Sequence, residues 1–384
     1  MRRSLRLPLS VFTALSLACG NPVEVHPGGD GSGSVGVPGP GGERGPEGPV
    51  GPPGPAGGYT RIKIVSPAPT PEEGGALMRA TFASLTTASA ENVWLVFVEP
   101  GVYDLGTEGL SLPPHVHVQG SGVALTTVRS HAEGPTLRIG EHTALRELTV
   151  EHSGGTADAV ALATTSAGFQ VRDVKASAWG GTSRTVAFAS TPTRESGGVT
   201  RLEARARASR GEVFGFQCEG CQARFSAASF HAEGGARAVG LSVRQGSLEL
   251  WDSFSTARAS AESVGVEAGN TSVLIVRSDV TASEAPSAAA VRLVTSPANV
   301  RDSSLVASGG AEGFALDTRQ GDKGSSAVNV QRSTLMGTIR GSTDYSVHLS
   351  GSLLRGGVEG QGVTCHGSYD DHYNTVPSDC GRVP

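Results

Sequence analysis

The chain has 384 residues, enough for one large domain or two ordinary ones, and its formal net charge is −5. This acidic balance argues against nucleic-acid binding, which needs clustered cations, so we expect no nucleic-acid partner. Aromatic residues make up only 5% of the chain while glycine reaches 54 residues. Such a composition suits closely stacked strands better than a bulky helical core.

Residues 1–18 have the features of an export signal. Three arginines at positions 2, 3 and 6 precede an apolar stretch that is too short to span a bilayer comfortably. The stretch ends in Ala18-Cys19-Gly20 and resembles a bacterial lipoprotein signal, in which Cys19 becomes the lipidated first residue. Ser16 stands where that family usually has leucine, and ordinary secretory cleavage is the alternative. The resemblance implies an exported protein, lipid-anchored at the outer membrane or cell surface of a Gram-negative bacterium.

Residues 19–32 lack apolar periodicity and are predicted to form a flexible tether. From Gly33 to Gly57 glycine then occupies every third position, over eight uninterrupted triplets. Three polyproline-II chains can wind together only if the residue at their axis lacks a side chain. The pattern therefore predicts a collagen-like stalk over residues 33–57, roughly 75 Å long at ~3.1 Å per residue, and hence a homotrimer. A linker that merely repeats glycine is the alternative.

Beyond Arg61 the sequence repeats with a period near 25 residues. Short apolar triplets recur at Leu137–Ile139, Val160–Leu162, Val186–Phe188, Phe214–Phe216, Val239–Leu241, Val264–Val266, Val291–Leu293, Phe314–Leu316 and Tyr345–Val347. Strands this short cannot bury a core singly, but stacked rungs can, with inward apolar residues in continuous columns. The spacing thus predicts a β-solenoid over residues 61–360.

The start of this region adds detail. Thr70-Pro71-Glu72-Glu73 predicts a helix start with a capping box, and Met78, Phe82 and Leu85 would share one face of that helix. The following segment, residues 92–128, contains Pro100-Gly101-Val102-Tyr103 and Gly120-Ser121-Gly122. It resembles the opening of the pectin-lyase-like superfamily. The resemblance implies an all-β fold, a right-handed parallel β-helix with an N-terminal capping helix.

Four cysteines remain if Cys19 is lipidated, and they form two local pairs. We predict structural disulfides between Cys218 and Cys221 and between Cys365 and Cys380; a redox or zinc role for the C-x-x-C pair is the alternative. The second pair would close a C-terminal tail over residues 361–384. His366, Asp370, Asp371 and His372 lie within that loop, and its closure explains them without a metal.

Enzymes of the resembled superfamily use acidic residues and an arginine. The candidates here are Arg172-Asp173, Arg277 with Asp279, and Arg301-Asp302. Because they recur at equivalent places in successive rungs, they indicate a structural ladder of charges. We therefore predict no catalytic residue, no metal site and no cofactor; His115 and His117 would be only half a metal site.

Trp179 and Trp251 follow strands and are candidate glycan contacts. The leading hypothesis is a surface-anchored structural or adhesive lipoprotein that presents a β-helical head and binds a polysaccharide or another cell-surface ligand. The alternative is a polysaccharide-acting enzyme, pectate-lyase-like or a carbohydrate esterase.

Overall fold

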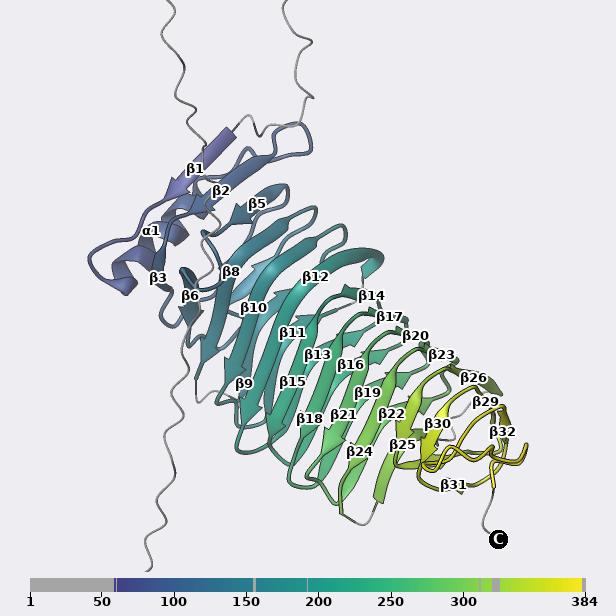
Figure 1. Cartoon of the computed structure of the whole chain (residues 1–384). Coiled ribbons are helices and arrows are strands. Elements are labelled where there is room, and N and C mark those ends of the chain that lie inside the picture. Colours follow the sequence, from purple (N-terminus) through teal and green to yellow (C-terminus); the bar gives the residue numbers. More distant parts are fainter. Residues whose placement is uncertain are drawn as a thin grey trace, which may run out of the picture. The chain divides into compact units, whose positions relative to one another are not determined.

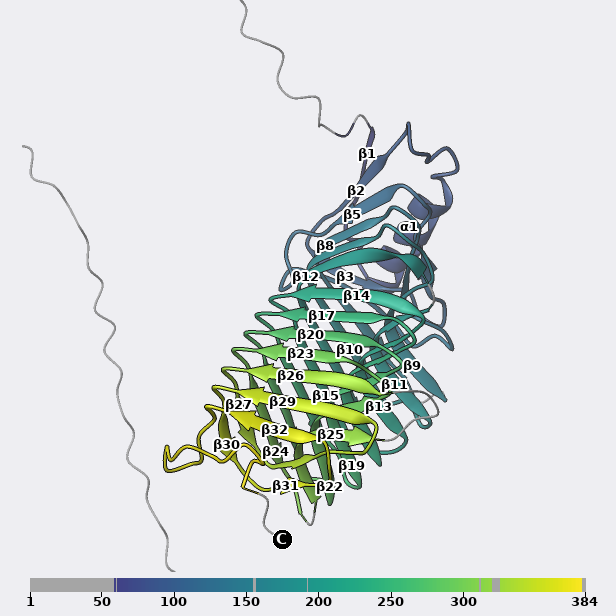
Figure 2. The same ribbon diagram turned by 90° about the vertical axis from the view of Figure 1, so that its right-hand side faces the viewer.

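The computed structural model describes Tyr59 and residues 61–154, 157–191, 193–310, 312–319 and 325–381. The predicted signal peptide, Cys19, the tether and the Gly-X-Y segment lie outside these residues. The described chain is a right-handed parallel β-helix, as predicted, and its strands stack into three faces (Figures 1 and 2). Within the described ranges, no helix is long and apolar enough to cross a membrane.

Faces 1 and 2 belong to one 21-stranded sheet. Face 1 contains β1 (Arg61–Val65), β2 (Trp94–Val98), β5 (Val116–Gln119), β14 (Cys221–Ser226), β17 (Ser247–Trp251), β20 (Ser272–Val276), β23 (Ala298–Arg301), β26 (Ser326–Gln331), β29 (Tyr345–Ser350) and β32 (Val363–His366). Face 2 contains β3 (Gly101–Asp104), β6 (Thr126–Ser130), β15 (Ser229–Gly234), β18 (Phe254–Arg258), β21 (Asp279–Ser283), β24 (Ser304–Ser308), β27 (Thr334–Met336) and β30 (Leu353–Arg355). Three longer strands run through both faces: β8 (Ala144–Ser153), β10 (Gln170–Trp179) and β12 (Thr193–Ala208).

Face 3 is a separate 11-stranded sheet. Its strands are β4 (Leu110–Ser111), β7 (Leu137–Ile139), β9 (Asp158–Thr164), β11 (Arg184–Ser190), β13 (Glu212–Glu219), β16 (Arg237–Arg244), β19 (Glu262–Gly269), β22 (Ser287–Val294), β25 (Glu312–Arg319), β28 (Thr338–Arg340) and β31 (Val358–Glu359). The coil continues through β32, beyond residue 360, into the segment predicted as the tail.

The helix α1 (Pro71–Ala83) covers the N-terminal end, beside β1, β2 and β3 (Figure 1). The side chain of Thr70 accepts a hydrogen bond from the Glu73 N–H, which confirms the predicted helix start. Met78 and Phe82 are buried, as expected for the apolar face of a cap. Gly75 lies so close to β3 that a Cβ there would be 1.9 Å from the Asp104 carbonyl oxygen, so only glycine permits this approach.

A tight corner joins face 1 to face 2 in every central rung. One residue with positive φ makes each turn, for example Asp252, Arg277, Asp302 and Arg332. A buried serine follows each of these residues, and its hydroxyl accepts a hydrogen bond from a backbone N–H of the preceding rung. The row comprises Ser253, Ser278, Ser303, Ser333, Ser352 and Ser368, with N···Oγ distances of 3.0–3.4 Å. It satisfies N–H groups that the corner removes from the strand ladders.

The centre of the solenoid is filled by aromatic rings. Phe216 on β13, Phe225 on β14 and Phe230 on β15 come from the three faces of one rung and are all buried. The Phe216 and Phe225 ring centroids are 4.8 Å apart, and Phe225 is 4.8 Å from Phe230. Phe188 of the preceding rung lies 5.2 Å from Phe216. These edge-to-face contacts thus connect the three faces near the middle of the solenoid.

The repeated triplets coincide with face 3, with two corrections. Tyr345–Val347 belongs to β29 on face 1, and the equivalent face 3 strand is β28. In addition, the first residue of most triplets points outward instead of into the core. Val160, Val186, Phe214, Val239, Val264 and Phe314 form a second apolar cluster with Ala163 and Ala289. Arginine side chains cover this cluster: the Arg340 guanidinium lies 3.7 Å from the Phe314 ring centroid. The apolar row therefore points away from the core and is still buried, because arginine side chains cover it.

These arginines are held by an ion-pair network along the outer side of face 3. Arg292 contacts Asp317 at 3.0 Å and Glu262 at 2.5 Å, and Arg237 contacts Glu262 at 2.7 Å. Arg319 also reaches Asp317, at 2.9 Å. The side chains of Arg292 and Asp317 are 3% and 0% exposed, so this pair is buried, whereas Arg319 is 41% exposed.

Candidate functional site

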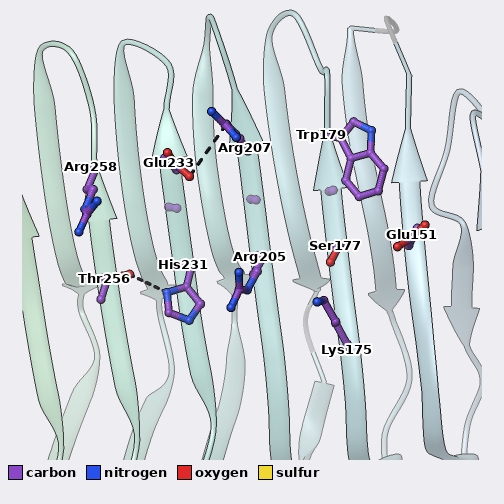
Figure 3. Close-up of a pocket in the computed structure, with 13 residues that line it drawn as sticks. Glu151, Lys175, Ser177, Trp179, Arg205, Arg207, His231, Glu233, Thr256 and Arg258 are labelled. Atoms are coloured by element: carbon purple, nitrogen blue, oxygen red, sulfur yellow. Dashed lines mark hydrogen bonds and ion pairs between the residues drawn. The ribbon is translucent and has the colours of Figure 1, made fainter. Parts of the chain in front are cut away.

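An open groove of about 850 Å³ runs across the outer side of face 2, over β8, β10, β12, β15 and β18 (Figure 3). Strand alternation explains which side chains line it. Ala176, Ala204 and Ala232 point inward and are buried. On each strand the residues that alternate with these alanines point outward, and they form two rows across the parallel strands. One row is Glu151, Ser177, Arg205, His231 and Thr256; the other includes Trp179, Arg207, Glu233 and Arg258.

Trp179 is the aromatic residue of the groove. It ends β10, and 40% of its surface is exposed. Figure 3 shows its indole ring near the rim, beside Ser177 and away from the charged side chains of β15 and β18. An exposed indole with hydrogen-bonding groups nearby offers a flat apolar surface to a ligand that is otherwise polar.

Among the described residues that line the groove, four are basic (Lys175, Arg205, Arg207 and Arg258) and two are acidic (Glu151 and Glu233), and glutamates in and beside the groove pair with the basic ones. Lys175 lies 3.6 Å from Glu203, Arg207 lies 4.0 Å from Glu233, and Arg258 lies 3.7 Å from Glu284. The side chains of these pairs are between 35% and 76% exposed, so water screens them and they contribute little to stability. Their donors and acceptors therefore remain available to a ligand.

His231 lies near the middle of the groove floor. Its Nδ1 is 2.8 Å from the Thr256 hydroxyl oxygen, a hydrogen bond that joins β15 to β18. Burial, together with the positive charge of Arg205, holds the pKa of His231 below its usual value of 6.5. The ring is therefore neutral at physiological pH and offers hydrogen bonds without a charge.

The two carboxylates that line the groove are far apart. Glu151 on β8 and Glu233 on β15 are separated by three strand spacings. At ~4.8 Å per spacing, the two strands that carry them are about 14 Å apart. The carboxyl pairs of glycoside hydrolases are only about 5–9.5 Å apart. This groove is therefore arranged for contact along a ligand, and Glu151 and Glu233 do not form such a pair.

The predicted charge ladder lies elsewhere, at the corner between faces 1 and 2, and its partners differ from those predicted. Asp302 pairs with Arg332 of the next rung at 2.7 and 2.9 Å, instead of with Arg301. Arg277 pairs with Asp252 at 2.6 and 2.8 Å, instead of with Asp279. Both expectations were wrong because side chains at equivalent corner positions are neighbours across rungs.

The third candidate pair, Arg172-Asp173, has an intra-strand contact at 3.3 Å. Asp173 also receives hydrogen bonds from Arg201 of the next rung, one of them at 2.7 Å. These hydrogen bonds and the charge of Arg201 hold the pKa of Asp173 below its usual value, and they outweigh its slight burial. Each pair joins two successive rungs, as a structural ladder would.

The other residues singled out from the sequence lie outside the groove. Trp251 ends β17 on face 1, where the Arg277 guanidinium lies 5.8 Å from its ring centroid; it does not line the groove. His115 stacks on His142 with ring centroids 5.1 Å apart. Disulfides join Cys218 to Cys221 and Cys365 to Cys380.

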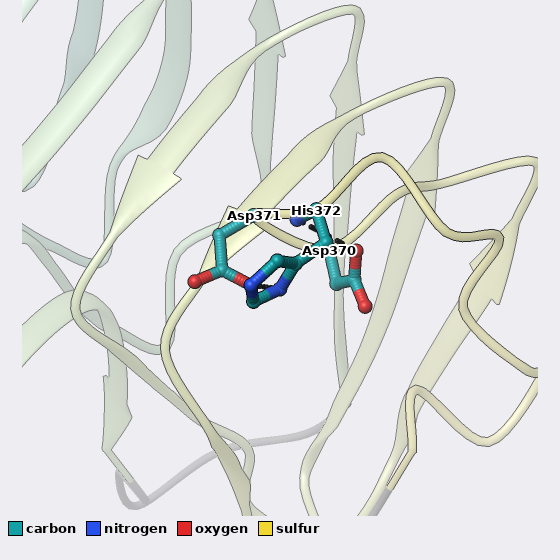
Figure 4. Close-up of side chains that lie close together, drawn as sticks. All are labelled: Asp370, Asp371 and His372. Carbon is teal, nitrogen blue, oxygen red and sulfur yellow. Dashed lines mark hydrogen bonds and ion pairs between the residues drawn. The ribbon is translucent and has the colours of Figure 1, made fainter.

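Asp370, Asp371 and His372 come together in the C-terminal tail (Figure 4). One oxygen of Asp370 accepts hydrogen bonds from the backbone N–H groups of His372 and Asn374, at 2.9 and 2.8 Å. The second oxygen accepts a hydrogen bond from the Asn374 side chain at 3.1 Å. Asp370 thus closes a turn, and within this turn His372 Nδ1 lies 2.8 Å from a carboxylate oxygen of Asp371.

The architecture defines the class of protein: a parallel β-helix with a helical cap. No family model matches the sequence, and no curated protein resembles it in sequence. Among solved structures, the A-module of a mannuronan C-5 epimerase from Azotobacter vinelandii is 13% identical, with a TM-score of 0.41 over 79% of this chain and 89% of that one. The Dettilon tailspike protein is 9% identical, with a TM-score of 0.42 over 84% of this chain and 68% of that one.

A third similar structure is the DFA-IIIase of Arthrobacter chlorophenolicus A6, in complex with DFA-III. It is 11% identical, with a TM-score of 0.41 over 85% of this chain and 87% of that one. These values are too low to relate the activities of the three proteins to this chain.

Proposed function

We propose that the β-helix is the glycan-binding head of a surface-anchored, adhesive lipoprotein, and that the groove on face 2 is its binding site. The observation that carries this proposal is the exposed indole of Trp179 in the same groove as the charged row of Arg207, Glu233 and Arg258. Sugar hydroxyls both donate and accept hydrogen bonds, so they suit a groove that offers both. The C–H faces of a sugar ring can pack on the indole.

A groove across five strands also matches a chain-like ligand. At ~4.8 Å per strand spacing, the distance from β8 to β18 is about 19 Å, which is enough for several sugar rings.

Replacing Trp179 with alanine is expected to weaken glycan binding at least about tenfold, which corresponds to a loss of ~1.4 kcal/mol. A glycan array would identify the ligand, and calorimetry would measure the affinity. Trp251→Ala is the matched control, since Trp251 stacks with Arg277 on another face. Equal losses in both variants, or none in Trp179→Ala, would exclude the groove. Bond cleavage that disappears in Glu151→Gln would favour the enzymatic alternative.

The N-terminal part of the proposal has its own test. Cys19 would carry the lipid anchor, residues 19–32 the tether and residues 33–57 a trimeric stalk that presents three heads and multiplies weak contacts. Cys19→Ser is expected to move the protein from the membrane fraction to the soluble fraction. Mass spectrometry of the mature N-terminus should show an acylated cysteine in the parent only. Membrane association that survives the substitution would exclude this anchor.

A further inference from the structure

The N-terminal strands carry an unusual apolar patch on the outer side of face 1. Ile62 and Ile64 on β1 are 57% and 59% exposed. Their partners on β2, Leu95 and Phe97, are only partly buried. We call these four residues the apolar patch. Exposed apolar groups gathered in this way, rather than scattered singly, indicate an interaction surface.

The chain enters β1 on the same side of the sheet. The Tyr59 hydroxyl is 2.7 Å from Nδ1 of His117, and the two rings meet edge-on with centroids 5.3 Å apart. His117 lies on β5 between the buried Val116 and Val118, so it points outward, and its strand partner is Leu95 of the patch. Tyr59 therefore reaches across the outer side of β2 and lies next to the patch.

The predicted Gly-X-Y repeat ends close to Tyr59 in the sequence. The last glycine of that repeat, Gly57, is two residues before Tyr59, a reach of at most about 7 Å. A glycine at every third position serves three chains wound around one axis. In the proposed trimer, three copies joined in this way would bring their Tyr59 residues, and hence their patches, close to one another.

We propose that the apolar patch is the contact between the heads of three copies of this chain. This inference rests on the trimeric stalk of the proposed function, and it adds a contact surface on the heads that would extend the association beyond the stalk. Burying the patch between copies would remove its isoleucines from water at the point where the stalk already holds the chains together, so the association is intramolecular in effect.

The charges on β1 favour contact through this outer side instead of through the edge of the strand. Among the described residues, β1 pairs only with β2, so its other edge is open. Lys63 lies on the inner side with the buried Val65, and the Arg61 guanidinium is 5.4 Å from the ring centroid of Trp94. Inward-pointing charges on an edge strand oppose the addition of another strand.

The test compares the full mature chain, carrying Cys19→Ser so that it stays in solution, with and without Ile62→Glu and Ile64→Glu. Sedimentation equilibrium is expected to show a trimer for the parent. The double variant should dissociate at a concentration at least about tenfold higher than the parent. Phe254→Glu is the control, because Phe254 is 52% exposed on a strand of face 2 and lies outside the patch.

A second measurement covers the case in which the glutamates prevent folding. Ile62→Cys should form disulfide-linked dimers under oxidation, while Phe254→Cys should not. A trimer of unchanged stability in the double variant, together with no cross-link at position 62, would overturn the interface and leave the trimeric stalk intact. A monomeric parent would overturn the stalk and the interface together.

Discussion

Phe216→Ala is expected to destabilise the β-helix by about 3–5 kcal/mol, the range for large-to-small changes at buried aromatic residues. Phe216 contacts rings of its own rung and of the preceding one, with centroids 4.8 Å from Phe225 and 5.2 Å from Phe188. Phe225 is itself packed against Phe230, with ring centroids 4.8 Å apart, and this limits its movement into the space that Phe216 would leave. Urea unfolding followed by circular dichroism would measure the loss.

Phe254→Ala is the control for this prediction, because about half of the Phe254 surface is exposed. It should change the unfolding midpoint far less. Because each rung of a solenoid contacts only its neighbours, Phe216→Ala could also split the unfolding transition into two steps. An unfolding curve identical to that of the parent would contradict the packing described here.

The second large effect is expected for Asp317→Asn, at about 3 kcal/mol. The substitution keeps the shape of the side chain but leaves Arg292, which is 3% exposed, without one of its two carboxylate partners. Removing one member of a buried ion pair is costly because the remaining charge is poorly solvated. Asp302→Asn is the matched control, since Asp302 and Arg332 form the same kind of contact in solvent. Equal losses in the two variants would contradict the role of burial.

The same network gives the stability of the protein a pH dependence. Burial alone would raise the pKa of Glu262, but Arg292 and Arg237 outweigh it and hold the pKa below the usual 4.5. A carboxyl group whose pKa is lower in the folded state stabilises the fold above its unfolded pKa, and this contribution is lost as the pH falls through the folded pKa. The contribution of Glu262 should therefore be fully present at neutral pH and disappear only below about pH 4.5.

The fold could be predicted because its repeat is visible in the sequence. Corner residues at 227, 252, 277 and 302 recur every 25 residues, and inward apolar residues keep the same spacing. The outward row headed by Val160 could not be predicted from alternation, because its burial depends on arginines from other rungs. The same reason applies to the partners of Asp302 and Arg277, which are 30 and 25 residues away in the sequence.

The groove was predicted only in part. Trp179 was singled out from its position after a strand, but the rows beside it were not. A signal was present: the segments KASAW, EARAR, FHAE and STAR place alanine between outward polar residues at matching positions. To recognise this signal, one must know which residues of successive rungs pair with each other. Apolar residues alternate along a strand, so their pattern alone leaves the pairing uncertain by two residues. Val291–Leu293 was displaced by that amount, since Val291 pairs with Val266 and not with Val264.

The serine row at the corner gives the solenoid a direction, because each corner depends on the rung that follows it in the sequence. Each N–H in the row is satisfied by a hydroxyl that arrives one rung later in the chain, from Ala228 with Ser253 through to Ser352 with Ser368. A coil that ended after any of these rungs would therefore leave one corner N–H without its serine partner. Ser368, in the C-terminal segment closed by the Cys365–Cys380 disulfide, accepts the hydrogen bond from the Ser352 N–H, and its own hydroxyl donates a hydrogen bond to the Leu349 carbonyl oxygen. This segment thus provides for the rung of Ser352 what each earlier rung receives from the rung that follows it.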